Sequence, residues 1–143
     1  MNPGAIVLRE TLLSMAINVA ITLAFFFAMF GLSGMIVPRD FAFDFLPQSF
    51  MVALMGTIIP GVLIGRKGKA PLQPIVLRAL GLALASLAIG GGGAYLLFAN
   101  GAPIAPATGL AIKVIYSAVL SAIVTPIAVR GALAAPALAR GKP

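Results

Sequence analysis

Long uncharged runs alternate with short polar breaks along this chain, and they predict four membrane-spanning helices. No charged residue lies between Thr11 and Val37, and about 20 consecutive apolar residues are enough for a helix to cross a bilayer. The first run is longer than that, so its helix is expected to tilt or to end early, near Gly31 or Gly34. The expected spans are 11–37, 48–65, 75–99 and 108–129. The predicted fold is therefore an all-α, antiparallel bundle of four transmembrane helices that forms one membrane domain, residues 1–143.

Prolines mark the ends and interiors of these spans. The second span is expected to begin near Pro47, with Asp44 in place to cap its first turn, after a loop that opens at Pro38. Pro60 and Pro126 lie late in the second and fourth spans. Because a proline ring removes a backbone N–H and crowds the preceding turn, each of these two residues predicts a kink.

One basic stretch, residues 66–74, divides the chain into two halves and fixes its predicted orientation. With the arginine that follows it, this hinge carries the cations Arg66, Lys67, Lys69 and Arg78. In a four-span protein these residues share one side with Arg9 and with the basic C-terminal tail. Cytoplasmic loops are enriched in Lys and Arg, so both termini and the hinge are expected in the cytoplasm. There the hinge cations are also expected to contact anionic lipid, at about 1 kcal/mol per residue near the surface.

The two halves follow a similar plan. Each begins at an arginine, crosses outward, and returns through a helix with a late proline. This favours a helical hairpin inserted twice in the same orientation, as parallel repeats. Few residues are identical between the two halves, so a bundle without internal duplication remains the alternative.

Composition supports the membrane assignment and removes most catalytic chemistry. The chain is 61% hydrophobic and 9% charged, whereas a typical soluble domain has about 25% charged residues. It contains no Cys, His or Trp, which excludes disulfides, Ser-His-Asp triads and metal sites built from Cys or His. Only three acidic residues remain, Glu10, Asp40 and Asp44. We therefore expect a non-enzymatic protein that uses no cofactor.

The net charge of +7 has a simpler explanation than nucleic-acid binding. Basic residues collect where the helices of a membrane protein meet the anionic cytoplasmic leaflet. No interleaved basic and aromatic surface is visible that would hold a nucleic-acid strand. We expect membrane lipids as partners and no nucleic acid.

Polar side chains inside the predicted spans form two stripes with a spacing of four residues. They are Ser14, Asn18 and Thr22 on the first span, and Lys113, Ser117, Ser121 and Thr125 on the fourth. Residues four apart lie on one helix face, and the two stripes fall at similar depth, which predicts a polar seam between these helices. The seam is open to two interpretations. It is either a set of interhelical hydrogen bonds, at about 0.6 kcal/mol each, or a polar path or small-molecule site.

Two charged residues near the spans are expected at the membrane surface. Lys113 is set within the fourth span, about a turn and a half from its outer end. Its long side chain is expected to reach the outer interface, although an ionisable residue at this depth is also a functional candidate. Glu10 adjoins Arg9 and is expected with it among the cytoplasmic head groups.

Small residues on the third span form a further packing signal. They are Gly81, Ala85, Ala88 and Gly92. Small residues four apart allow two helices to approach closely, so this face predicts contact with a neighbour, either within the chain or from another copy. The glycine run 90–93 is expected to mark close helix contact or local unwinding.

The stretch Asp44-Phe45-Leu46-Pro47-Gln48-Ser49-Phe50-Met51, with Ile59-Pro60-Gly61 beyond it, resembles small bacterial inner-membrane proteins of unknown function. The resemblance covers about the first half of the chain. It implies a multi-pass protein of the bacterial inner membrane and carries no activity. Four short spans also resemble the small multidrug-resistance transporters, which use a glutamate within the first span. Glu10 does not match that glutamate, because it is expected at the membrane edge.

These observations favour a non-enzymatic accessory or scaffolding subunit that acts through helix packing. It would pack against itself, as a homo-oligomer, or against a larger membrane complex. The alternative is a small permease that works as an oligomer through the polar seam between the first and fourth helices.

Overall fold

The computed structural model describes the backbone of residues 2–68 and 72–140, and the side chains of residues 2–64 and 72–134. Every regular element in these ranges is a helix. Four helical segments among the described residues are long and apolar enough to cross a membrane: Pro3–Met29, Pro38–Ile64, Leu72–Phe98 and Pro106–Ala134. The prediction of an all-helical chain with four such segments is confirmed.

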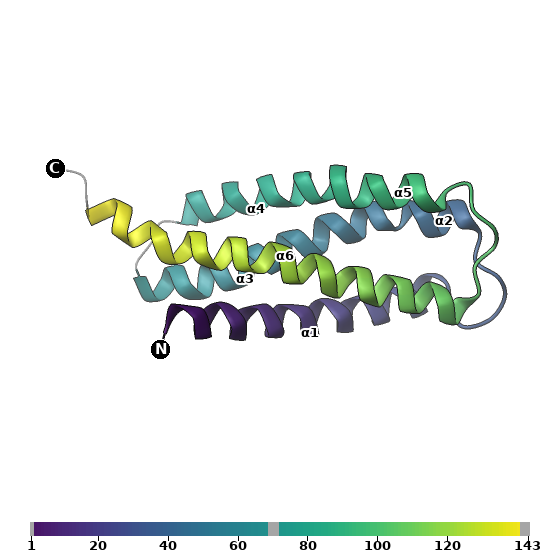
Figure 1. Cartoon of the computed structure of the whole chain (residues 1–143), viewed down its shortest axis with the longest axis horizontal. Coiled ribbons are helices and arrows are strands. Elements are labelled where there is room, and N and C mark those ends of the chain that lie inside the picture. Colours follow the sequence, from purple (N-terminus) through teal and green to yellow (C-terminus); the bar gives the residue numbers. More distant parts are fainter. Residues whose placement is uncertain (1, 69–71, 141–143) are drawn as a thin grey trace.

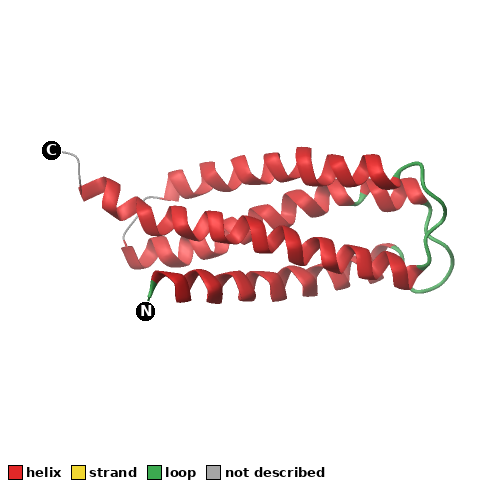
Figure 2. Ribbon diagram, viewed as in Figure 1, coloured by secondary structure: helices red, strands yellow, loops and turns green. Residues whose placement is uncertain are grey.

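The four segments lie side by side along the long axis of the molecule (Figure 1). Helices α3 (Phe45–Gly68) and α6 (Pro106–Arg140) pack against each other, α1 (Pro3–Met29) lies along α6, and α4 (Leu72–Ser86) lies along α3. A narrower contact joins α1 to α3. The start of α1 and the end of α6 are at the same end of the molecule, and loops close the opposite end (Figure 2).

Helix α1 begins eight residues before the start of the predicted span 11–37. It ends at Met29, well before the end of that span. The side chain of Asn2 accepts a hydrogen bond of 3.1 Å from the backbone N–H of Gly4, and Pro3 occupies the first helical position. This is a favourable helix start. The Asn2 side chain accepts from a backbone N–H that has no partner within the helix, and Pro3 has no backbone N–H that would need a partner. After Met29 the chain turns through Gly31 and Gly34, with φ angles of 65° and 82°. The predicted boundaries are therefore wrong, although an end near Gly31 was one of the two expected outcomes.

The predicted loop between Pro38 and Pro47 is mostly helical. It contains the short helix α2 (Pro38–Phe43), and α3 begins at Phe45. Asp44 lies at the junction of the two helices. Its carboxylate is directed at α6 and does not cap α3, so that expectation is also wrong.

Helices α3 and α6 run without a break through the two prolines expected to kink them, Pro60 and Pro126. Helix α6 also continues past the predicted end of the fourth span, residue 129, to Arg140. Of the predicted hinge cations, Arg66 and Lys67 lie in the last turns of α3, where only the backbone is described. Lys69 lies outside the described residues, and Arg78 is exposed on α4.

The third span contains a π-helical turn, η1 (Leu87–Gly91), between α4 and α5 (Gly92–Phe98). A Cβ atom on Gly91 would lie 3.1 Å from the Cα of Leu46 and 3.1 Å from the carbonyl oxygen of Phe45. These contacts are tighter than ordinary van der Waals contacts, so glycine favours the close approach of the start of α3. In the described residues only the second half has a π-helical turn and only the first half has a helix like α2, so the two halves differ in detail.

The predicted small-residue face of α4 does not pack within the chain. Gly81, Ala85 and Ala88 are exposed and Gly92 is half-buried. The buried face of α4 is formed instead by Ile75, Ala79, Ala83 and Ser86. Beyond Arg78, α4 carries only apolar or small residues up to Ser86, so the pattern gave little indication of which face turns inward.

Aromatic side chains fill the end of the molecule opposite the termini. Rings from α1, α2, α3, α5 and α6 contact one another there: Phe26, Phe30, Phe41, Phe45, Phe98 and Tyr116. Two backbone hydrogen bonds of 2.8 and 3.0 Å join Ile36 to Ile104 and tie the two loops together. This cluster holds the α2–α3 junction, and with it Asp44, beside α6.

Candidate functional site

The polar stripes of α1 and α6 face each other in the interior. The Asn18 side-chain amide donates hydrogen bonds to Ser121 Oγ, at 3.0 Å, and to Ser14 Oγ, at 3.3 Å. The Thr125 hydroxyl donates to Ser14 Oγ at 2.9 Å. All four side chains are buried. The structure thus brings these predicted residues into one hydrogen-bonded group, which we call the seam.

Helix α3 closes the seam from the side. A Cβ on Gly56 would lie 3.1 Å from Thr125 Oγ1 and 3.3 Å from Ser14 Oγ. A larger residue at this position would push the helix away, so Gly56 lets the α3 backbone lie directly against the hydroxyl groups. The polar groups of the seam bond to one another, and this part of the interior is held together by packing and hydrogen bonds.

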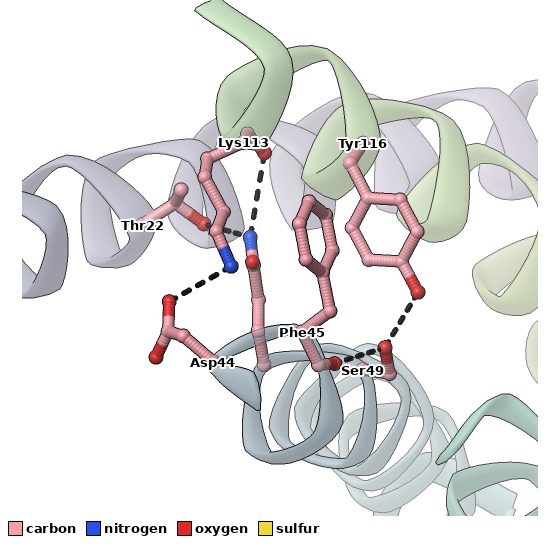
Figure 3. Close-up of polar contacts among 7 residues, drawn as sticks. Thr22, Asp44, Phe45, Ser49, Lys113 and Tyr116 are labelled. Atoms are coloured by element: carbon pink, nitrogen blue, oxygen red, sulfur yellow. Dashed lines mark hydrogen bonds and ion pairs between the residues drawn. The ribbon is translucent and has the colours of Figure 1, made fainter. Parts of the chain in front are cut away.

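Toward the aromatic end the polar contacts pass from α1 to α6 through Gln48 of α3. Its side-chain amide donates to Thr22 Oγ1 at 3.2 Å and to the backbone carbonyl of Lys113 at 3.3 Å (Figure 3). Sequence reasoning missed Gln48. The predicted span 48–65 began at this residue, whereas α3 begins at Phe45 and so places Gln48 one turn inside the helix.

Lys113 does not reach the outer interface, so that expectation is wrong. Its side chain is 1% exposed, and Nζ lies 2.9 Å from Asp44 Oδ2 (Figure 3). The ammonium also lies 3.5 Å from the centre of the Phe45 ring and 4.9 Å from that of Phe41. A carboxylate and two aromatic rings therefore lie around the buried charge, and each of them favours a cation.

Phe45 is held under the ammonium by a second group of contacts. The Phe45 and Tyr116 rings meet edge to face with their centres 4.8 Å apart. The Tyr116 hydroxyl lies 2.5 Å from Ser49 Oγ, and Ser49 donates to the carbonyl oxygen of Phe45 at 2.5 Å. A Cβ on Gly90 would lie 2.6 Å from the Tyr116 hydroxyl. The π-helical turn therefore leaves the space that Tyr116 occupies.

Three buried polar atoms have no hydrogen-bond partner among the described residues: Gln48 Oε1, Lys113 Nζ and Ser117 Oγ. Of these atoms, Lys113 Nζ is paired with a charge, because it lies 2.9 Å from Asp44 Oδ2. A buried polar group without a partner costs about 1–3 kcal/mol. Gln48 Oε1 and Lys113 Nζ belong to side chains that line one cavity, which makes this cavity a stronger candidate site than the hydrogen-bonded seam.

A cavity of about 120 Å³ lies beside these two side chains, between α1 and α3. Asn18, Thr22, Asp44, Gln48 and Lys113 supply its polar lining. The apolar lining comes from Ile21, Phe25, Phe26, Pro47, Met51, Val52 and Met55. Ile21, Phe25 and Met51 are exposed on the outer surface of the helices. The cavity therefore has a polar inner end and an apolar mouth on the side of the molecule.

At the other end of α1, Glu10 continues the buried stripe of Ser14, Asn18 and Thr22. Glu10 is 4% exposed and is therefore enclosed by protein, contrary to the expected position among head groups. Arg9, which is 59% exposed, donates to Glu10 Oε1 from Nε at 3.1 Å and from Nη2 at 2.5 Å. This burial follows from the early start of α1, which places Glu10 in its third turn.

Among the described residues, no group of three or more acidic, His or Cys side chains is placed to hold a metal ion. What the cavity offers is one cation, one carboxylate and one amide beside an apolar wall. These groups suit the binding of a small organic solute. The chain matches no family model, no curated protein and no solved structure.

Proposed function

We propose that the protein is a small permease that binds its solute in the cavity between α1 and α3. The observation that carries this proposal is the burial of Lys113 against Asp44 at the cavity wall. An ionisable side chain within a membrane span is costly and commonly marks a functional site. A buried ion pair often contributes less stability than apolar residues of the same size. Lys113 is therefore better explained by solute binding than by folding.

The proposed location is the bacterial inner membrane, with both termini and the basic hinge in the cytoplasm. Arg9, Arg78 and Arg130 are exposed at or near the end where α1 begins and α6 finishes. The opposite end carries Arg39 and Asp40, whose charges cancel. The excess of cations at one end supports this orientation. In this orientation, the cavity lies in the outer half of the membrane.

The test is solute uptake into vesicles that contain the purified protein. A panel of small labelled carboxylates, amides and amines is compared between the wild type, Lys113→Met and empty vesicles. We expect at least one solute to enter faster with the wild type, and this difference to disappear in Lys113→Met. Leu96→Ala, on an exposed residue outside the cavity, is the matched control and should keep the uptake. A panel in which no solute exceeds empty vesicles contradicts the proposal.

An accessory or scaffolding role is the second candidate, and the outer face of α4 favours it. Gly81 and Ala85 are exposed on this helix and Ala88 on the π-helical turn η1 that follows it, and a Cβ on Gly81 would meet nothing within 4 Å. If a second copy or another membrane protein packs here, Gly81→Leu should dissociate the complex in a mild detergent. Ala102→Leu, in an exposed turn, should not. A wild type that is monomeric and partner-free in native mass spectra contradicts this role.

A further inference from the structure

The cavity between α1 and α3 also indicates which class of solute fits it, and this step rests on the proposed function. We infer that it takes a small monocarboxylate together with one proton, so that the bound pair is electrically neutral. Four features of the site lead to this conclusion: its hydrogen-bonding atoms, its charge, its size and its opening.

At the polar end of the cavity, the protein can bind one hydrogen-bond acceptor and one hydrogen-bond donor of a ligand. Lys113 Nζ can only donate, and its contact with Asp44 Oδ2 at 2.9 Å leaves N–H groups without an acceptor among the described residues. Gln48 Oε1 can only accept and has no donor in the same part of the chain. A carboxylic acid group supplies both partners, since its carbonyl oxygen accepts and its hydroxyl donates. A protonated amine can only donate and an ether can only accept, so neither supplies both partners.

The charge of the site favours a neutral guest. Lys113 and Asp44 already cancel each other. An additional carboxylate would leave one uncompensated negative charge in a largely buried site, which is unfavourable. The α1 side chains that line the cavity are not titratable (Asn18, Ile21, Thr22, Phe25 and Phe26). The Tyr116 hydroxyl bonds to Ser49, so the proton must be shared between the ligand and Asp44.

Size and lining restrict the rest of the ligand. A cavity of about 120 Å³ is slightly smaller than the roughly 150 Å³ cavity that holds benzene in an engineered protein. Met51 and Met55 line its wall, and flexible methionine side chains adapt to differently shaped apolar groups. The ligand is therefore a carboxylic acid with a short apolar chain of a few carbon atoms.

The opening lies on the lateral surface, between two helices. Ile21, Phe25 and Met51 surround it, and Phe25 is 64% exposed. In a four-span protein this surface faces lipid, so a neutral acid can reach the site from the bilayer. Gln48 Oε1 and Lys113 Nζ are both covered at present. The ligand reaches them when Gln48 turns and gives up its two long hydrogen bonds, of 3.2 and 3.3 Å.

The methionines provide the test. The full chain is labelled at its methionine methyl groups, placed in lipid bicelles and titrated with butyrate, butyramide or butylammonium. We expect saturating shifts of the Met51 and Met55 signals with butyrate and butyramide, and none with butylammonium. Met29 and Met35 are exposed and do not line the cavity, so they report only partitioning into the bicelle. Calorimetry in two buffers of different ionisation heat should give about one proton taken up per butyrate and none per butyramide.

Two variants check that binding occurs in this cavity. Ile21→Trp fills the mouth and leaves the Lys113–Asp44 pair in place, so it should weaken butyrate binding at least tenfold. Leu84→Trp makes the same kind of change at an exposed position of α4 and should leave the affinity within twofold of the wild type.

The outcomes separate this inference from the proposed function. Butyrate bound without proton uptake, or saturating shifts with butylammonium alone, overturns the ligand class while solute binding in the cavity stands. If none of the three compounds produces a saturating shift, the ligand class is wrong, and the uptake panel decides separately whether the protein is a permease.

Discussion

Lys113 on α6 and Asp44 at the α2–α3 junction form an ion pair inside the protein, with Nζ 2.9 Å from Oδ2. The Lys113 side chain is 1% exposed and that of Asp44 is 24% exposed. The pair joins two segments that are far apart in the sequence. It is also the point where the polar interior meets the cavity.

The two members of the pair should depend on each other for stability. Asp44→Asn leaves a buried ammonium without its carboxylate, and we expect it to lower the free energy of unfolding by about 3 kcal/mol. The double variant Asp44→Leu with Lys113→Met removes both charges and should lie within about 1 kcal/mol of the wild type. Denaturant unfolding in detergent, followed by circular dichroism, measures both. Equal stability of Asp44→Asn and the wild type would show that the ion pair is absent in the membrane protein.

The seam should behave as a modest, coupled set of hydrogen bonds. Asn18→Leu and Ser121→Ala each remove one side of a 3.0 Å contact. Each should destabilise the protein by about 1 kcal/mol, with a coupling energy in the double-mutant cycle of about 0.6 kcal/mol. The same unfolding assay measures these effects. If the effects of the two substitutions are additive, the predicted coupling between Asn18 and Ser121 is wrong.

Glycine substitutions in the third span should differ according to position. Gly91→Ala places a Cβ 3.1 Å from backbone atoms of α3 and should destabilise by about 1–3 kcal/mol through overpacking. Gly93→Ala, two residues away, meets nothing within 4 Å and should be neutral or stabilise the helix by up to about 1 kcal/mol. Melting temperatures in detergent compare the two variants. A lower melting temperature for Gly93→Ala than for Gly91→Ala would contradict the packing described for η1.

Glu10 and Arg9 should respond asymmetrically to substitution. Arg9→Leu removes the exposed partner and leaves a buried carboxylate unpaired, so it should be clearly destabilising. Glu10→Gln removes the buried charge and leaves Arg9 in contact with water or head groups, so its effect should be small. The exposed Asp40 supplies a control, Asp40→Asn, which should also have little effect. Melting temperatures in detergent measure these effects. A larger decrease for Glu10→Gln than for Arg9→Leu would contradict the burial of Glu10.

The sequence predicted those features that depend on local pattern. Uncharged runs of sufficient length indicated four helical segments. The four-residue spacing of Ser14 and Asn18, and of Ser121 and Thr125, indicated the helix faces that contact each other in the structure. Residues on one face of a helix can be recognised in this way, because the helical repeat is fixed.

Features that depend on the distance between separate segments could not be predicted in the same way. The pairing of Lys113 with Asp44 requires the helix α2, which lies where a loop was expected, and the aromatic cluster that holds it. The burial of Glu10 did have a local signal. Asn2 followed by Pro3 is a favourable helix start, and it placed the beginning of α1 eight residues before the expected position.

The contact between the polar faces of α1 and α6 is the foundation of this account, and cross-linking tests it most directly. The chain has no cysteine, so Asn18→Cys with Ser121→Cys introduces the only two thiols. Oxidation with copper phenanthroline in native membranes should join them within one chain. The control pair, Leu12→Cys with Ser121→Cys, has its first thiol on the exposed face of α1 and should stay reduced. An Asn18–Ser121 pair that stays reduced while the control pair cross-links would contradict the account.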